Sequence, residues 1–209
     1  MSGIVHVVDD DASFRTAIER RLKKAGYAVV TYPSAQQLLD RLPNDNEPSC
    51  ILLDVRIPRL SGPELQRRLV ELGSTLPIVF LTGYADIETT VRTIKAGAED
   101  FLIKPVSSEH LLHAVEQALL HHETIRTQRN KLDVLRAQIA KFTPRERQVF
   151  ELVVRGKINK QIAHELGTTE RTIKAHRQQV MEKAKVQSLV ELVALAKRLG
   201  ITTQDPVDS

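Results

Sequence analysis

Four short apolar runs in the first half of the chain each end at a side chain that can bind a metal ion or a phosphoryl group. These side chains are, in chain order, Asp9 with Asp10, Asp54, Thr82 and Lys104. If the runs are parallel strands of one sheet, all of these groups open onto one edge of that sheet. Carboxylates suit Mg²⁺, which takes a few protein oxygens together with water and phosphate oxygens. The pattern therefore predicts a site that holds a divalent metal beside a phosphoryl group.

The chemistry of this site follows from its residue types. An aspartate beside a bound metal can attack a phosphoryl donor and form an acyl phosphate. The metal and Lys104 would neutralise charge on the transferred group. For any one of these residues alone, a solvated surface charge is the better interpretation. Their repetition at successive strand ends, together with Lys104-Pro105, favours the site.

Residues 1–122 alternate between two kinds of segment. Apolar runs typical of strands are separated by segments whose apolar residues recur at three- and four-residue steps. The runs lie near residues 4–8, 28–31, 50–54, 77–82 and 100–103. This alternation predicts an α/β domain with a doubly wound five-stranded parallel sheet, covered by helices on both faces. Ligands of such sheets bind beyond the carboxyl ends of the strands.

Length and composition favour two small domains and a cytoplasmic protein. The chain has 209 residues, of which 42% are hydrophobic, so two ordinary cores can form. Its single cysteine, Cys50, excludes an intramolecular disulfide framework. No apolar stretch approaches the ~20 residues that span a bilayer, so we expect no membrane partner. Basic residues exceed acidic ones by five in residues 141–209, whereas acidic residues exceed basic ones by three in residues 1–122. The basic part hints at a polyanion-binding module.

A long helical stretch joins the two parts of the chain. The helical pattern is continuous from about residue 107 to residue 141, and this stretch contains neither proline nor glycine. We expect residues 123–141 to form a helical linker between two domains. A dimeric coiled coil is a weaker alternative that stays open, because His122 and Arg129 would fall on its seam.

Residues 142–200 are predicted to form an all-α domain of four helices, followed by a flexible tail at residues 201–209. Thr143 and Glu146 form a capping box that predicts the start of the first helix. The second and third helices, joined by a short turn at residues 167–169, have helix-turn-helix dimensions.

The third of these helices carries a polar outer face. On a helical wheel Ile173 and Val180 turn inward. Lys174 can then reach guanine acceptors, Gln178 adenine, and Ala175 a thymine methyl group in a major groove. A solvated charged face is the ordinary alternative, but the turn spacing favours DNA. The expected DNA contacts are Lys160 (placed for phosphate), Arg171, Lys174, Ala175, Arg177 and Gln178.

The motifs of residues 1–122 resemble a response-regulator receiver domain. They are Val8-Asp9-Asp10, Leu53-Asp54-Val55-Arg56-Ile57-Pro58 with Ser61-Gly62, Leu81-Thr82-Gly83, Lys95-Ala96-Gly97-Ala98 and Phe101-Leu102-Ile103-Lys104-Pro105. The resemblance implies Asp54 as the phosphoacceptor and Mg²⁺ as the cofactor. Asp10, Asp54 and the backbone carbonyl of Arg56 would bind the ion. Asp9 would act mainly through water, and Lys104 would pair with the phosphate.

The same resemblance implies a switch pair. Thr82 and Phe101 match a hydroxyl that moves toward the phosphoryl group and a ring that turns inward. Simple core packing of Phe101 is an equally good alternative. Asp11 extends the acidic run, and we expect it in the first turn of the next helix rather than on the metal.

A phosphatase of the haloacid-dehalogenase type is a different class that also uses a nucleophilic aspartate at a strand end. Such an enzyme needs a second acid two residues later as its general acid. Arg56 occupies that position and cannot donate a proton at neutral pH. The sequence therefore favours a phosphoacceptor, with slow autodephosphorylation at most, over an enzyme.

The basic part of the chain resembles a LuxR/NarL-type tetrahelical domain. Its motifs are Thr143-Pro144-Arg145-Glu146-Arg147, Asn159-Lys160 with Ile162-Ala163, Leu166-Gly167 and Arg171-Thr172-Ile173-Lys174 with His176-Arg177. The whole chain is thus similar to a NarL/FixJ-family response regulator, with the FixJ-like branch nearest. This resemblance implies a sensor histidine kinase, promoter DNA and RNA polymerase as partners. It also implies a homodimer that forms on phosphorylation, for which exposed Val91 and Lys95 are the candidate surface.

A rival hypothesis is a constitutive DNA-binding protein whose receiver serves only as a dimerisation scaffold. It keeps the fold but makes Asp54 dispensable. The intact acid pair, Thr82 and Lys104 argue against it.

Overall fold

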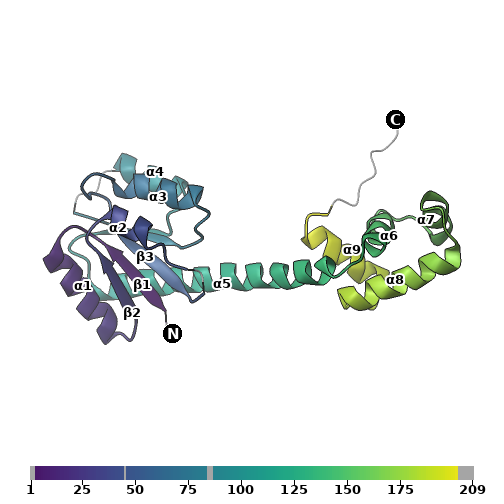
Figure 1. The fold of residues 1–209 in the computed structure, drawn as a ribbon. Helices are drawn as coiled ribbons and strands as arrows, with labels where there is room; N and C mark the ends of the chain where they lie inside the picture. The colour runs from purple at the N-terminus through teal and green to yellow at the C-terminus, as the bar shows by residue number, and fades with distance from the viewer. Residues whose placement is uncertain (1–2, 45, 84–86, 202–209) are drawn as a thin grey trace. The chain divides into compact units, whose positions relative to one another are not determined.

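The computed structural model describes residues 3–44, 46–83 and 87–201, with the backbone alone for residues 87–89. It divides into two compact units, Met1–Thr127 and Gln128–Ser209. The boundary falls inside one helix, α5 (Ser108–Ala140), which Figure 1 shows continuing past the first unit. The predicted tail lies outside the described residues from residue 202 onward. Within the described ranges, no helix combines the length and the apolar character needed to cross a membrane.

A five-stranded parallel sheet forms the centre of the first unit. Its strands are β1 (Ile4–Val8), β2 (Ala28–Tyr32), β3 (Ser49–Asp54), β4 (Ile78–Thr82) and β5 (Asp100–Ile103). Their order is β2-β1-β3-β4-β5, and every neighbouring pair is parallel. The predicted fold class and the predicted strands are confirmed. The strand order reverses beside β1, so its carboxyl end and that of β3 form the crevice where ligands of such sheets bind.

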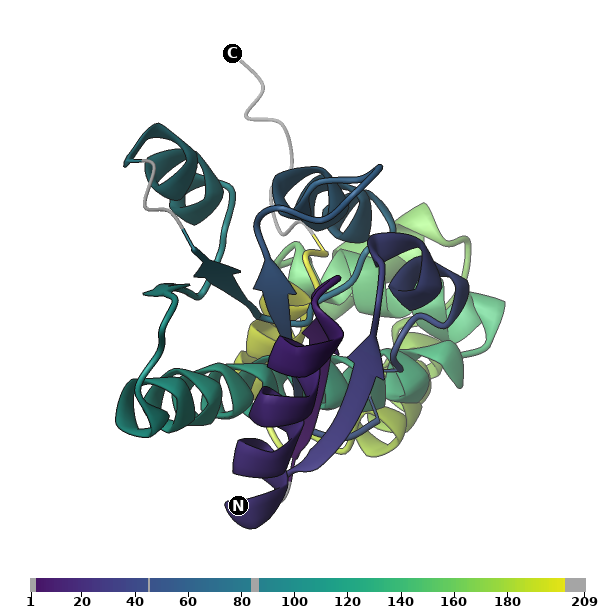
Figure 2. The same ribbon diagram turned by 90° about the vertical axis from the view of Figure 1, so that its left-hand side faces the viewer.

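Helices cover both faces of this sheet. They are α1 (Ala12–Lys24), α2 (Ala35–Asp40), α3 (Gly62–Glu71), α4 (Ile87–Lys95) and the first part of α5. Val7 and Leu52 pack against α1 and α5, whereas Val8 and Leu53 pack against α2 and α3. Successive strand residues point to opposite faces, so neighbours along one strand enter two different cores. Figure 2 shows the helices on either side of the sheet.

The long helix contributes to the core of each unit in turn. His122, which interrupts its apolar pattern, is fully buried, and its Nδ1 accepts the Ser49 N–H at 2.9 Å. This polar residue therefore belongs to the first unit rather than to a coiled-coil seam. Farther along, Ile139 is buried in the core of the second unit and Leu135 packs against it.

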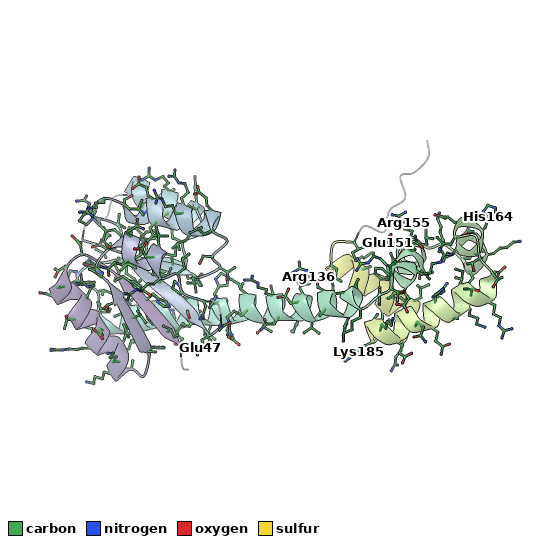
Figure 3. The ribbon with its side chains drawn as sticks, in the orientation of Figure 1. Glu47, Arg136, Glu151, Arg155, His164 and Lys185 are labelled. Atoms are coloured by element: carbon green, nitrogen blue, oxygen red, sulfur yellow. The ribbon has the colours of Figure 1, made fainter. Side chains whose placement is uncertain are left out.

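Within residues 128–201, the described part of the second unit, four helices follow α5. They are α6 (Pro144–Val154), α7 (Asn159–Glu165), α8 (Glu170–Ala184) and α9 (Leu189–Arg198). The predicted capping box of Thr143 and Glu146 is present at the start of α6. Phe142 and Phe150 meet edge to face in the core with ring centroids 5.4 Å apart. Figure 3 shows Glu151 and His164 projecting away from that core.

A buried histidine lies in the middle of β1. His6 is 5% exposed, and its Nδ1 lies 3.1 Å from the hydroxyl of Tyr32 on the neighbouring strand. Burial lowers the pKa of His6 from 6.5 to about 4, because a charged imidazole would lose its hydration there. The native protein therefore holds this imidazole neutral.

His6 predicts a loss of stability in mild acid. Between pH 6.5 and about 4 the unfolded chain binds a proton at His6 that the native chain does not bind. The free energy of unfolding should therefore have its full value above pH 6.5, and it should fall by up to about 3 kcal/mol as the pH approaches 4. Urea unfolding at several pH values measures this loss. His6→Phe is the control, and an equal acid-induced loss in this variant would contradict the assignment.

Candidate functional site

Three carboxylates meet at the carboxyl ends of β1 and β3. One oxygen each of Asp9, Asp10 and Asp54 lies within 4.8 Å of the other two. Asp9 is fully buried, Asp54 is 8% exposed, and Asp10 faces solvent. The parallel register places Val8 beside Leu53, so the residues that follow them are brought together. An oxygen-only donor set that opens to water on one side fits a hard divalent cation such as Mg²⁺.

The ammonium group of Lys104 completes this cluster. Its Nζ donates to Asp9 Oδ2 at 2.5 Å and to Asp54 Oδ2 at 2.8 Å. The same Nζ lies 3.9 Å from the ring centroid of Phe14, which adds a cation–π contact. These contacts bring Lys104 to the phosphoryl site that the sequence predicted.

Burial and pairing act in opposite directions on these charges. Burial raises the pKa of Asp9 above its ordinary value, although hydrogen bonds from Lys104 and the Asp11 N–H oppose it. Burial alone would lower the pKa of Lys104, but its hydrogen bonds to Asp54 and Asp9 outweigh burial and raise it. The lysine therefore stays charged, and positive charge beside Asp9 opposes the rise that burial causes in the pKa of Asp9.

Backbone donors orient the carboxylates. The Asp11 N–H donates to Asp9 Oδ1 at 2.9 Å, and the Arg56 N–H donates to Asp54 Oδ1 at 3.1 Å. Asp11 itself is the N-cap of α1, where it accepts from two backbone N–H groups, and these bonds lower its pKa. Asp11 was expected in the first turn of this helix, but it lies one position earlier, at the N-cap. A short carboxylate there accepts hydrogen bonds from the free N–H groups of the helix start. The metal-binding role of the Arg56 carbonyl stays a prediction.

The expected switch residues lie on neighbouring strands. Thr82 ends β4 and is 1% exposed, whereas Phe101 on β5 is only partly buried. Phe101 pairs in register with Phe80, and the two ring centroids are 6.2 Å apart. This contact shows that Phe101 packs at the margin of the core, so its part in a switch stays a prediction.

Gly62 is a site residue for which residue spacing alone predicts no role. A Cβ atom there would lie 2.5 Å from the Asp54 carbonyl oxygen and 2.9 Å from the Phe80 ring. The start of α3 thus rests directly on the backbone of Asp54, and only glycine permits this approach. The Ser61-Gly62 pair in the receiver motif was the available signal.

Gly62→Ala is expected to disturb the Asp54 loop. Because the added methyl group meets backbone, the variant should lose about 1–3 kcal/mol of stability and accept phosphate more slowly. Urea unfolding and phosphoryl incorporation from acetyl phosphate measure the two effects. Gly83→Ala is the matched control, since a Cβ there meets nothing within 4 Å. Equal behaviour of the two variants would contradict the close approach.

The second unit presents a polar helix pair. Ile173, Val180 and Ala184 are buried, which confirms the predicted inward face of α8. Arg177 is partly buried and its guanidinium donates to Asn159 Oδ1 at 2.8 Å, so it joins α8 to α7. The other predicted DNA contacts are exposed on α7 and α8; they are Lys160, Arg171, Lys174, Ala175 and Gln178.

A partly buried ion pair positions α8. Lys183 donates to both oxygens of Glu146, at 2.6 and 2.8 Å, and Glu146 is 5% exposed. The hydrogen bond from Lys183 lowers the pKa of Glu146. The capping carboxylate of α6 therefore also anchors the end of α8, a role that sequence spacing did not reveal.

Apolar side chains remain on the surface of both units. On α4, Val91 is 46% and Ile94 is 44% exposed, and Lys95 beside them is also exposed. On α9, Val190 is 78% exposed whereas Leu195 is buried. Val91 and Lys95 are thus accessible, as a contact surface requires.

Both units of the chain match known protein families. Residues 5–116 match the family described as response regulator receiver domain, and residues 140–196 match bacterial regulatory proteins of the luxR family. Nodulation protein W of Bradyrhizobium diazoefficiens is 40% identical over 95% of this chain and 87% of its own length. The transcriptional regulatory protein FixJ of the same organism is 39% identical over 95% and 97%. The solved structure of the response regulator StyR has a TM-score of 0.82 and 42% identity, covering 95% and 100% of the two chains.

The receiver fold, its acidic cluster and the helix-turn-helix unit define a two-component response regulator. The chain belongs to the FixJ-like response regulators, which combine a receiver domain with a LuxR-family DNA-binding domain. It is a transcription factor whose regulation depends on phosphorylation.

Proposed function

We propose that Asp54 is the residue that accepts the phosphoryl group, from a phosphohistidine of a partner sensor kinase. The observation that carries this assignment is the contact of Lys104 Nζ with Asp54 Oδ2 at 2.8 Å, inside a cluster of three carboxylates. The Asp54 oxygen attacks phosphorus, the bond to the kinase histidine breaks, and an acyl phosphate forms. Lys104 is placed to pair with the new phosphate oxygens.

We propose Mg²⁺ as the cofactor of this transfer. Asp10, Asp54 and the Arg56 backbone carbonyl would hold the ion, and Asp9 would act mainly through water. When bound, the ion supplies positive charge against the phosphoryl oxygens. The chain stores the phosphate as a signal and turns over no other substrate.

The output is proposed to be a receiver dimer. The Thr82 hydroxyl moves toward the phosphoryl group and the Phe101 ring turns inward, which changes the surface of α4 and β5. Exposed Val91 and Lys95 on α4 form the contact. Two basic domains are then tethered together, and the tether raises the effective concentration of each for the second half-site.

The domain assignment follows the chemistry. We propose residues 1–122 as the receiver, 123–141 as the helical linker and 142–200 as the DNA-binding domain. The expected partners are the kinase, promoter DNA and RNA polymerase. Since DNA is the target, we propose that the protein acts in the cytoplasm.

Asp54→Asn tests the phosphoacceptor. The amide is nearly isosteric with the carboxylate but cannot form a stable acyl phosphate, so phosphoryl incorporation from the kinase or from acetyl phosphate should vanish. Intact-mass spectrometry measures it. Undiminished phosphorylation of the variant at another residue would refute the assignment.

The same variant separates regulation from a constitutive scaffold. Beryllofluoride with Mg²⁺, a mimic of the phosphoryl group, should shift the wild-type chain to a dimer in gel filtration and leave Asp54→Asn monomeric. A dimer of constant size in both proteins, with or without the mimic, would favour the scaffold.

Lys174 and Lys160 should have different roles on DNA. Lys174→Ala should cost about 1–3 kcal/mol on cognate DNA and relax discrimination, since base contacts carry sequence information. Lys160→Ala should weaken binding on all sequences and reduce the salt dependence, as expected for a phosphate contact. Titration of cognate and random duplexes at several salt concentrations measures both. Equal losses on both duplexes for Lys174→Ala would remove it from base readout.

A further inference from the structure

A buried glutamine joins α3 to α4. Gln66 is 2% exposed, and its Nε2 donates to the backbone carbonyls of Thr93 and Ala96, each at 3.2 Å. These carbonyls belong to the last turn of α4 and the residue after it, and the Thr93 carbonyl also accepts the Ala98 N–H at 3.0 Å. The side chain thus caps a helix 27 residues and more away in the chain. We call Gln66 and these two carbonyls the α4 latch.

The latch matters because the described part of α4 buries few of its side chains. Of the α4 residues whose side chains are described, 90–95, only Thr93 is buried. Val91 and Ile94, the large apolar residues of that stretch, are 46% and 44% exposed. Helices in proteins are usually stabilised by an apolar face packed into the core. Two hydrogen bonds from a buried amide therefore help to position this part of α4.

The latch is also connected to the phosphoryl site. Gln66 lies one helical turn after Gly62, whose Cα packs against the backbone of Asp54 and whose N–H donates to the Val55 carbonyl. A short rigid helix thus runs from the Asp54 loop to the underside of α4. This route does not pass through Thr82 or Phe101.

We propose that Gln66 is a positioning residue that pre-organises α4 and so presents Val91 and Ile94 in one geometry for the receiver dimer. This inference rests on the proposed dimer surface. Without the latch, α4 samples several positions, and the dimer must order it at a cost to affinity. Phosphorylation of Asp54 itself is not affected, because Gln66 touches neither the carboxylates nor Lys104.

Gln66→Leu tests the latch in the full-length chain. Leucine keeps the buried volume but removes both donated hydrogen bonds. Amide hydrogen exchange without a phosphoryl donor should speed up by about tenfold in residues 90–98. Exchange in β1 and β3 should be unchanged. Arg68→Met, on the same helix, exposed and outside the cavity that α3 and α4 line, is the matched control and should leave α4 unaffected. If Gln66→Leu is unfolded, Gln66→Met provides the same test.

The functional half is tested by sedimentation with beryllofluoride and Mg²⁺. The dimer of Gln66→Leu should dissociate about tenfold more readily than the wild type, while acetyl phosphate still labels Asp54 at the wild-type rate. Unchanged exchange in α4 would overturn the latch. An unchanged or tighter dimer, despite a loosened α4, would overturn its pre-organising role.

A separate variant distinguishes failure of the dimer surface from failure of the latch. Val91→Asp places a charge on the exposed face of α4 and should abolish the mimic-induced dimer. A dimer that survives this change would refute the proposed surface and the pre-organising role built on it. The exchange result would still decide whether Gln66 positions α4.

Discussion

The charge imbalance around Lys104 is the constraint on which the receiver depends. Three carboxylates crowd within 4.8 Å, and the Lys104 ammonium neutralises one of them through its contacts with Asp9 and Asp54. Like charges about 4 Å apart repel by about 4 kcal/mol at a protein surface. The site therefore retains an excess of negative charge that favours a divalent cation. Positive charge from Lys104 and from a bound cation would stabilise a phosphoryl group in this acidic cluster.

The fold brings these charged groups together and fixes the distances between them. Asp9, Asp54 and Lys104 come from three strands that share one parallel sheet, so the register of the sheet sets their distances. Gly62 lets α3 rest on the Asp54 backbone, and Gln66 on the same helix holds α4. Contacts of one short helix therefore lead from the Asp54 backbone to a surface helix. In the proposed dimer the DNA-binding unit needs no chemistry of its own, because the tether between two copies sets its output.

Sequence reasoning succeeded where the signal is local or periodic. The strands, the carboxylate cluster with Lys104, and the Thr143–Glu146 capping box follow from spacing and strand ends alone. It failed where a polar side chain finds a distant partner. His122 looked like an interruption of an apolar face, but it is buried against Ser49, 73 residues away. The contact of Gln66 with α4 could not be predicted from the sequence, because it joins two helices that meet only in the folded chain.

We propose that phosphorylation of Asp54 acts on DNA binding by pairing two chains. To test this, the affinity of the wild-type protein is compared for two duplexes, one with a single half-site and one with paired half-sites. Both half-site sequences come from selection of random DNA. Each is titrated with and without acetyl phosphate and Mg²⁺. Phosphorylation should strengthen binding to the paired site and leave the affinity for the single half-site nearly unchanged. An equal gain on both duplexes, or none on the paired site, would contradict it.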